Sequence, residues 1–388
     1  MSAKFLIVGA GFSGAVMAYR LSKLMGGCQI DIWEEKPHIA GNCFTERDAQ
    51  TGIMIHRYGP HIFNTDRKEI WDFVNQFIRL NTIMHRVKAV YNGNVYTLPV
   101  NLHTINQFFN KTFSPNEAKA FIKSIADKNI SNPKNFEEQA LKFIGKDLYK
   151  AFFYSYTKKQ WGCEPTALPA SILKRLPVRF NYEDSYYNNP LVGIPVEGYT
   201  PFVEKMLYNN ENITVTLNRK FSPQDDCSSY DHIFFTGPLD AFFNYKFGRL
   251  GYRTVLFEQF YSEGDFQGTS VMNYCDESVK YTRITEHKHF TPWEQHQNTV
   301  CFTEFSKETS ENDIPFYPKR LEKDKKLLIQ YRNEAEQLQN VSFLGRLATY
   351  RYMDMHHVIG EALSFSEIFA NSFSSGGKRP IFPNIEIS

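Results

Sequence analysis

The residues best suited to chemistry near the start of the chain are Gly9, Gly11 and Gly14, followed twenty residues later by Glu34. Glycines at this spacing allow a tight turn and a close approach of backbone to a pyrophosphate. An acidic residue at this distance accepts hydrogen bonds from an adenosine ribose and repels a 2′-phosphate. The pattern predicts a dinucleotide site, although such glycines without their structural context form only a turn.

The elements around these glycines have the order that a dinucleotide site requires. Residues 5–8 are typical of a buried parallel strand, residues 15–24 of a helix, and residues 29–33 of a second strand that ends at Glu34. A helix N-terminus after the glycines offers free N–H groups to phosphates. We therefore assign to the cofactor site Gly9, Gly11, Phe12, Ser13, Gly14, Glu34 and Glu35.

Two arginines are candidates for binding a diphosphate. Arg175 lies between Pro169 and Pro177, in a segment that could close over a site as a mobile lid, and Arg283 lies in a predicted strand region. A guanidinium donates paired hydrogen bonds and stays charged, which suits a diphosphate. A lone arginine is more often a solvated surface charge, so these residues alone leave both interpretations open.

Composition excludes several classes of protein. The chain has 388 residues, which predicts two to three domains, and 44 basic against 42 acidic residues give a net charge of +2 that favours neither nucleic acid nor an acidic membrane. An aromatic content of 15 % argues against disorder. The six cysteines lack zinc-like spacing, and His287 and His289 have no visible third ligand, so we predict a cytoplasmic protein without a metal site.

The remaining segments differ in their hydrophobic period. Residues 104–174 have helical spacing, and residues 87–98, 253–260, 271–274 and 299–305 are typical of strands in an antiparallel sheet, with an Asn92-Gly93 hairpin turn. Residues 231–236 predict a strand that returns to the first sheet. Residues 319–339 predict a charged helix and 341–344 a short strand. We expect the tail after Phe373 to be loosely held.

Longer motifs resemble one family of flavoproteins. Residues 38–42 resemble a His-Ile-Gly-Gly-Asn segment of the glutathione-reductase-like superfamily, with Ala40 in place of a glycine. Six further segments resemble bacterial UDP-galactopyranose mutases, in the family's order from residue 4 to about residue 370. They are residues 56–63, 156–161, 173–182, 281–289, 345–347 and 350–355.

The resemblance implies a fold, α/β with three domains. A discontinuous FAD-binding Rossmann-like domain of the glutathione-reductase-like superfamily would comprise residues 1–80, 195–242 and 318–388. A helical bundle would comprise residues 101–180, with a mobile lid near 167–183. An antiparallel sheet domain that binds the substrate would comprise residues 81–100, 181–194 and 243–317.

The resemblance also implies an isomerase activity: a flavin-dependent, redox-neutral interconversion of a nucleotide-diphosphate hexopyranose and hexofuranose through an adduct of the sugar with flavin N5. FAD would act in its reduced form. Because no second dinucleotide fingerprint with its strand and helix occurs, electrons would come from external NAD(P)H or another reductant. The family often forms homodimers and serves cell-surface polysaccharide synthesis. The alternatives are an amine- or porphyrinogen-oxidase-like flavoenzyme and a non-catalytic nucleotide-sugar binding module.

The resemblance assigns individual residues to roles. Catalytic roles fall to His61, Arg175 and Arg283, and substrate contacts to Phe152, Phe153, Tyr156, Thr157, Trp161, Tyr186, Asn273, Tyr317 and Tyr352. Cofactor contacts fall to Gly41, Asn42, His61, Arg346, Tyr352, Asp354 and Met355. The aromatic residues could instead be core, His61 could be a buried histidine satisfied by main chain, and His356 and His357 are interpreted as structural.

Two positions depart from the family, and we expect both in the substrate site. Asn64 stands where relatives commonly have histidine, and His85 where they commonly have asparagine. The exchange is either neutral, preserving one hydrogen bond, or it alters recognition of the sugar's C2 or C6 substituent. UDP-galactopyranose is the first expected substrate, with dTDP-fucopyranose and UDP-N-acetylgalactosamine as alternatives.

Overall fold

The glycine-rich segment follows the middle strand of a five-stranded parallel sheet. The computed structural model describes residues 2–175 and 178–383, without the side chains of residues 174 and 175. The strand order is β10 (Ile213–Thr216), β2 (Gln29–Trp33), β1 (Lys4–Val8), β11 (His232–Phe235) and β17 (Val341–Phe343), and all neighbours are parallel. The predicted opening βαβ unit and the returning strand are thus confirmed.

Helices cover both faces of this sheet, which explains why β1 is apolar without alternation. Phe5 and Ile7 pack toward α1 (Phe12–Leu24), α7 (Thr200–Leu207) and α11 (Met355–Ser374). Leu6 and Val8 face the opposite side, where α9 (Glu322–Ala335) packs beside the short α8 (Leu239–Phe242). The charged helix predicted over 319–339 is therefore confirmed as α9.

A seven-stranded sheet follows in the order β16 (Tyr317–Pro318), β12 (Tyr252–Glu263), β15 (Asn298–Glu308), β14 (Arg283–Glu286), β13 (Val271–Tyr274), β7 (Val87–Tyr91) and β8 (Asn94–Leu98). The predicted strands form, and Asn92 and Gly93 turn the β7–β8 hairpin with positive φ. One expectation is wrong: β7 and β13 are parallel. A helical segment of the chain separates them, and so long a connection allows two strands to run in the same direction.

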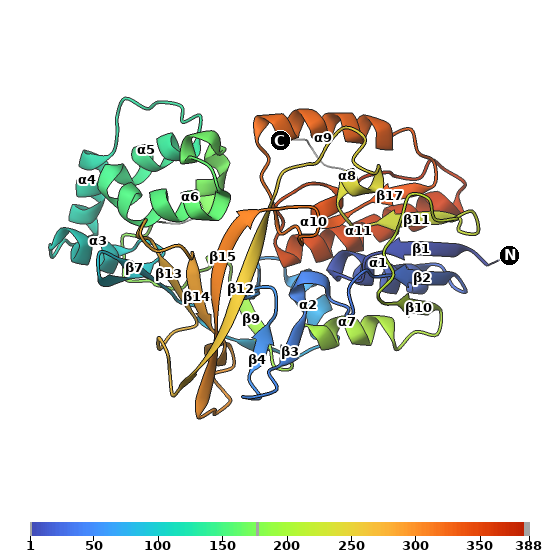
Figure 1. The fold of residues 1–388 in the computed structure, drawn as a ribbon, viewed down its shortest axis with the longest axis horizontal. Coiled ribbons are helices and arrows are strands. Elements are labelled where there is room, and N and C mark those ends of the chain that lie inside the picture. Colours follow the sequence, from blue (N-terminus) through green and yellow to red (C-terminus); the bar gives the residue numbers. More distant parts are fainter. Residues whose placement is uncertain (1, 176–177, 384–388) are drawn as a thin grey trace.

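The helical segment comprises α3 (Leu102–Phe109), α4 (Pro115–Ile125), α5 (Phe136–Tyr149), a π-helical turn over Lys150–Tyr154 and α6 (Ser155–Trp161). Short 3₁₀ turns over Pro165–Ala167 and Ala170–Arg175 follow. Ser114 caps α4 and Pro115 is its first residue, as the sequence predicts. Figure 1 shows this segment at one end of the molecule and the parallel sheet at the other, with β12 and β15 between them.

Smaller elements lie between these units. β9 (Leu191–Pro195) pairs with β5 (Phe63–Thr65) and β6 (Leu80–Thr82), and β3 (Thr45–Arg47) pairs with β4 (Met54–His56). The helix α2 (Lys68–Asn75) follows β5. Residues 191–195 therefore join this small sheet and not the seven-stranded one.

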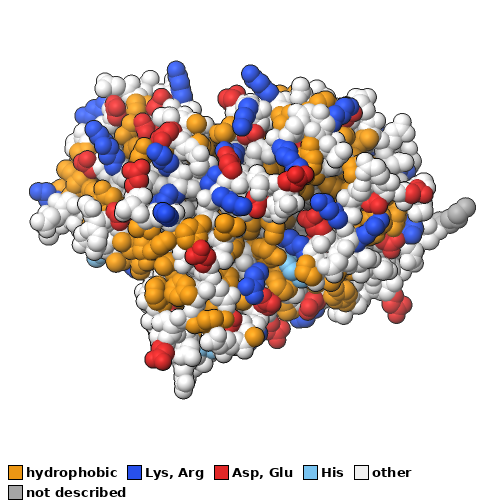
Figure 2. All heavy atoms as spheres, viewed as in Figure 1, with side chains coloured by type: hydrophobic (Ala, Val, Ile, Leu, Met, Phe, Trp, Pro, Cys, Tyr) orange, Lys and Arg blue, Asp and Glu red, His pale blue; other side chains and the backbone are white. Residues whose placement is uncertain are grey.

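The end of the chain is more firmly held than expected. Phe382 is buried against Phe343, with ring centroids 5.3 Å apart, and the Phe343 N–H donates to the Ile381 carbonyl at 2.7 Å. The expectation of a loosely held tail is thus wrong for residues 381–382, because an aromatic side chain reaches the core. On the face drawn in Figure 2, positive and negative side chains are interspersed. Among the helices that the structure describes, none is long and apolar enough to cross a membrane.

Candidate functional site

The glycines at the start of α1 form a cradle of backbone. Gly9 has φ of +103°, and a Cβ on Gly14 would lie 2.0 Å from the Gly9 carbonyl oxygen, so neither position accommodates a side chain. Gly11 precedes α1 and no side chain caps this helix end, so its first N–H groups are free to bind an anion. Phe12 and Ser13, in the first turn of α1, are buried.

Glu34 closes one side of the cradle. Its carboxylate accepts from the Ala10 N–H at 2.7 Å and from the Lys36 N–H at 2.9 Å. Burial raises the pKa of Glu34, and these two N–H groups lower it in part. Glu35 is exposed, so the structure brings Glu34 and not Glu35 to the glycines.

The opposite side of the cradle carries two residues with positive φ. Ala40 has φ of +68° and Gly41 of +54°, and the Asn42 side chain accepts from Lys36 Nζ at 2.7 Å. A Cβ on Gly41 would lie 3.2 Å from the Gly11 Cα, so the two loops nearly touch. Left-handed backbone costs alanine conformational energy that glycine does not lose. Alanine at position 40, where the superfamily segment has glycine, therefore strains this loop slightly.

Arg346 lies beside the cradle in α10 (Gly345–Ala348), where a Cβ on Gly345 would lie 2.2 Å from Ser13 Oγ. Its Nε and Nη2 atoms are buried and have no hydrogen-bond partner among the described residues. Its guanidinium lies 5.0 Å from the Tyr317 ring centroid and 4.8 Å from that of Tyr352. A buried guanidinium with unpaired donors favours binding an anionic group, so a dinucleotide cofactor fits this cradle.

His61 lies beside the cradle in a turn that begins at His56. Its Nδ1 lies 2.8 Å from the Gly59 carbonyl, so Nδ1 carries the proton and Nε2 is an acceptor. The His61 N–H donates to Nδ1 of His56 at 3.3 Å. Burial lowers the pKa of His61 to about 4, partly opposed by its bond to Gly59. The side chain is neutral near pH 7, and main chain satisfies one of its nitrogens.

A cavity of about 180 Å³ lies between α6, the π-helical turn and the seven-stranded sheet. Nine of the predicted residues line it: Phe152, Phe153, Tyr156, Thr157, Trp161, Tyr186, Asn273, Arg283 and His85. Phe152 and Phe153 also belong to the hydrophobic core of the helical segment. They are therefore core residues that line the cavity as well. Neighbours that the sequence did not single out include Tyr187 and Gln160.

Arg283 is the charged group of this cavity. Its Nε donates to Glu304 Oε2 at 2.7 Å, and Thr285 Oγ1 donates to the other oxygen of this buried carboxylate at 2.9 Å. Burial opposes the charge of Arg283, but Glu304 raises its pKa well above the ordinary value. Asn273 faces Arg283 across β13 and β14, and its Oδ1 is buried without a partner within the described part of the chain. Nothing in the sequence near Arg283 pointed to Glu304, which lies 21 residues away.

An aromatic group connects the cavity to the cradle. Tyr317 and Tyr352 are stacked with ring centroids 5.6 Å apart, and Trp161 lies 6.4 Å from each. Trp161 lines the cavity and both tyrosines lie against Arg346. The two candidate sites are thus adjacent.

The two residues that depart from the family have separate partners. Asn64 is buried and accepts from Asn189 Nδ2 at 2.6 Å, and it does not line the cavity. His85 lines the cavity with Nδ1 3.4 Å from Ser270 Oγ, and burial together with Arg283 lowers its pKa to about 4. The structure therefore places His85 in the cavity and Asn64 on β5, which pairs with β9, and the substrate contact of Asn64 stays a prediction.

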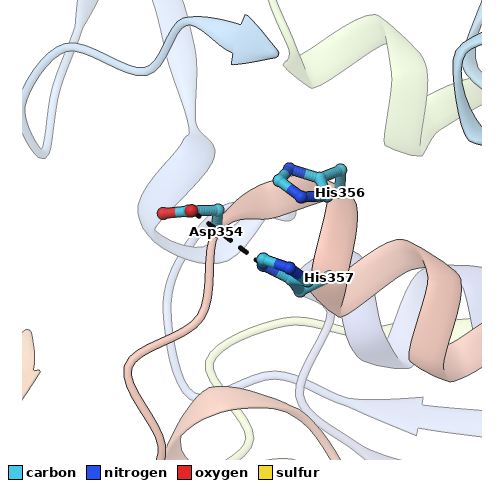
Figure 3. A group of neighbouring side chains, drawn as sticks. All are labelled: Asp354, His356 and His357. Atoms are coloured by element: carbon cyan, nitrogen blue, oxygen red, sulfur yellow. Dashed lines mark ion pairs between the residues drawn. The ribbon is translucent and has the colours of Figure 1, made fainter. Parts of the chain in front are cut away.

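Asp354 and Met355 lie at the start of α11. Asp354 is exposed and His356 buried, and Asp354 Oδ2 lies 3.9 Å from Nδ1 of the exposed His357 (Figure 3). These three side chains have a spacing that could hold a metal ion. The N-terminus of α11 is the positive end of a helix dipole and disfavours a cation, so the group fits an anionic or polar neighbour better.

A second group with ligand spacing consists of Asp265, Glu286 and His289. Glu286 already accepts three backbone N–H groups, from residues 266–268, which accounts for its burial. Of the two predicted arginines only Arg283 can be placed, because the side chain of Arg175 lies outside the described residues.

Comparison with known proteins gives consistent relatives. A family model described as UDP-galactopyranose mutase matches residues 151–352, and one described as an NAD(P)-binding Rossmann-like domain matches residues 7–77. The chain is 52 % identical over 377 residues to a probable UDP-galactopyranose mutase of Klebsiella pneumoniae, covering 97 % of each chain. It is 49 % identical over 372 residues to a dTDP-fucopyranose mutase of Escherichia coli, covering 94 % of this chain and 98 % of that one.

Solved structures share the fold at low identity. A reduced UDP-galactopyranose mutase superposes with a TM-score of 0.75 at 13 % identity, covering 99 % of both chains. A putative protoporphyrinogen oxidase from Exiguobacterium has a TM-score of 0.64 at 12 % identity, covering 96 % of this chain and 99 % of that one. The α/β fold is therefore common to mutases and oxidases, and the residues of the site must distinguish them.

Proposed function

The chain belongs to the UDP-galactopyranose mutase family, and we propose that it is an isomerase that interconverts a nucleotide-diphosphate hexopyranose and its hexofuranose, with no net oxidation. One observation carries this proposal: the cavity with Arg283 meets the cradle with Arg346 at the aromatic group of Trp161, Tyr317 and Tyr352. A nucleotide sugar and a dinucleotide cofactor bound in these sites would meet there.

FAD is the cofactor that we propose for the cradle. The free N–H groups of α1 would bind its pyrophosphate, Glu34 its ribose, and the unpaired donors of Arg346 an oxygen acceptor. When bound and reduced, FAD would supply an electron-rich nucleophile for reaction at the anomeric carbon of the sugar. The electrons would come from NAD(P)H or another external reductant. Gly41, Asn42, His61, Asp354 and Met355 stay predicted cofactor contacts.

Arg283 would hold the nucleotide diphosphate while it is detached from the sugar. A redox-neutral rearrangement must return the same diphosphate to the sugar, so the leaving group has to stay bound. Arg283 is permanently charged, and within the described residues only its Nε donor is bonded to a side chain, that of Glu304. Its Nη donors could bind phosphate oxygens. We propose Arg175 as its second partner on the basis of the family's pattern.

The aromatic residues would bind the other parts of the substrate. Phe152, Phe153 and Tyr156 surround the end of the cavity proposed for the base, and stacking there favours a planar ring. Burial raises the pKa of Tyr156 and Tyr186, so their phenols stay protonated and can donate to phosphate oxygens. Asn273 Oδ1 could accept from a sugar hydroxyl.

UDP-galactopyranose is the first proposed substrate, and dTDP-fucopyranose is the second. The probable UDP-galactopyranose mutase at 52 % identity supports the first, and the dTDP-fucopyranose mutase at 49 % supports the second. His85 in the cavity also favours altered recognition of the sugar. UDP-N-acetylgalactosamine remains a third candidate. We further propose a cytoplasmic homodimer that serves polysaccharide synthesis, with the three domains divided as the family resemblance implies.

The test is to incubate the protein with UDP-galactopyranose, dTDP-fucopyranose and UDP-N-acetylgalactosamine under nitrogen, after reduction with dithionite or NADPH. We expect furanose product from at least one sugar, no product with strictly oxidised protein, and no stoichiometric oxygen consumption in air. Full turnover by the oxidised protein would contradict the flavin role. Oxygen consumption with an amine substrate would favour the oxidase alternative.

A further inference from the structure

The side chain of Lys159 leaves α6 and enters the connection between β13 and β14. Its Nζ lies 2.7 Å from the carbonyl oxygen of Tyr274, 3.1 Å from that of Asp276, 2.9 Å from that of Val279 and 3.1 Å from that of Tyr281. An ammonium has three N–H donors, so four carbonyls surround it and share them. One side chain therefore contacts the backbone at several points along the connection of residues 275–282.

These contacts join two walls of the cavity. The helix α6 that carries Lys159 also supplies Tyr156 and Trp161 to one wall. The connection that Lys159 enters links Asn273 at the end of β13 to Arg283 at the start of β14. Hydrogen bonds from a charged donor are short and strong, so the link between the two walls is stiff.

A second set of contacts holds the end of α6 against β12 and β15 of the same sheet. Arg253, on β12, is buried and donates from Nε to the Gln160 carbonyl at 3.0 Å and from Nη2 to the Lys159 carbonyl at 3.3 Å. Ser306 Oγ, on β15, donates to the same Gln160 carbonyl at 2.6 Å. The last carbonyls of α6 are therefore satisfied by the sheet. Among the described residues, Lys159 is the α6 side chain that hydrogen-bonds the backbone of the β13–β14 connection.

We propose that Lys159 is a positioning residue that sets the distance between the wall of Tyr156 and Trp161 and the wall of Asn273 and Arg283. This inference rests on the proposed function, in which Tyr156 of the first wall contacts the base and Arg283 of the second wall holds the diphosphate. A ligand that reaches both walls would depend on Lys159. A ligand that uses mainly the base wall would depend on it little.

Lys158 offers a matched control. It is the preceding residue on the same helix, and its Nζ is paired with the exposed Glu164 at 2.8 Å and lies 4.0 Å from Glu277. It makes none of the four carbonyl contacts. Lys158→Met and Lys159→Met therefore remove the same charge from the same helix. The first breaks only exposed ion pairs, whereas the second removes the four hydrogen bonds to the backbone of the connection.

The experiment measures the dissociation constants of UDP and UMP for the oxidised, FAD-loaded protein by calorimetry. In Lys159→Met we expect the ratio of the UMP constant to the UDP constant to fall by at least about tenfold, because one misaligned charged hydrogen bond at Arg283 has that effect. The UMP constant itself should change by less than about threefold, since the base wall is intact. Lys158→Met should match the wild type in both.

Two results would overturn the inference. An unchanged ratio in Lys159→Met would mean that the spacing does not depend on this residue, and an equal loss of UMP and UDP affinity would mean a merely structural role. If Lys159→Met does not fold, Lys159→Arg replaces it, because a planar guanidinium cannot reach four converging carbonyls. A ratio equal to that of the wild type would then refute the proposal.

Amide hydrogen exchange separates this inference from the proposed function. Peptides over residues 275–282 should exchange faster in Lys159→Met than in Lys158→Met, without any nucleotide present. Failure of the wild type to convert any of the three nucleotide sugars would contradict the proposed function alone. Equal exchange in the two variants would contradict the link through Lys159 alone.

Discussion

Replacing Arg283 by alanine is expected to have two consequences, on catalysis and on stability. If two of its N–H groups bind the diphosphate at about 1.5–3 kcal/mol each, kcat/KM falls by about 10²–10⁴-fold. The same change leaves Glu304 buried at 1 % exposure without its cation. An unpaired buried charge lowers the free energy of unfolding by about 3–5 kcal/mol.

The double variant Arg283→Ala/Glu304→Gln separates these consequences. Glutamine removes the uncompensated charge and can still accept from Thr285, so it should recover most of the lost stability. It cannot replace the donors to the diphosphate, so kcat/KM should remain as low as in Arg283→Ala. Stability is measured by urea unfolding of FAD-loaded protein, and kcat/KM with dithionite-reduced enzyme.

Arg249→Ala is the control, because Arg249 forms an exposed pair with Glu311 at 3.1 Å. Such surface pairs contribute about 0–1 kcal/mol, so both measurements should stay near the wild type. Loss of one charged hydrogen bond to the diphosphate should lower kcat/KM by more than about tenfold. The reasoning is therefore refuted if kcat/KM of the double variant lies within about tenfold of the wild-type value. It is also refuted if Glu304→Gln gives no recovery of stability.

Three further predictions follow from the site. Ala40 is buried with φ of +68°, a conformation that a β-branched residue rarely adopts. Ala40→Val should therefore lower the free energy of unfolding, measured in urea, by about 2–4 kcal/mol and reduce the FAD content. Ala40→Gly should stay within about 1 kcal/mol of the wild type. The exchange variant Asn64→His/His85→Asn should change the ratio of kcat/KM for dTDP-fucopyranose and UDP-galactopyranose if His85 selects the sugar, and an unchanged ratio would mean that the exchange is neutral. Because folding lowers the pKa of His85 to about 4, the unfolded chain binds a proton first as the pH falls. The stability contributed by neutral His85 is present above pH 6.5 and is lost toward pH 4, by up to about 3 kcal/mol, and His85→Asn should reduce this slope of unfolding free energy against pH.

The cofactor half of the site was predictable because its signals are local. Gly9, Gly14 and Glu34 lie in one βαβ unit, where the strand and helix periods determine which residues meet. Gly345 approaches Ser13 so closely that a Cβ on Gly345 would lie 2.2 Å from Ser13 Oγ. These residues are far apart in the sequence, and apart from the family motif no local pattern predicted that they would meet.

The substrate half depended on contacts between distant segments. The resemblance identified Arg283 and Tyr156, but not Glu304, which sets the charge of Arg283, nor Lys159, which joins α6 to the β13–β14 connection. A lysine in a charged helical segment is typical of a solvated face, and only the packed structure brings four backbone carbonyls around it.

The sequence by itself determined the elements, the dinucleotide motif and the family, since each depends on residue types at short spacing. The tertiary structure decided the parallel pairing of β7 with β13, the burial of Phe382, and the separate partners of Asn64 and His85. Strand pairing and side-chain partners depend on which distant surfaces pack together, and the spacing of residues along a chain does not specify that packing. For this reason the chemistry of the site was predictable in kind, and the side chains that hold it in place were not.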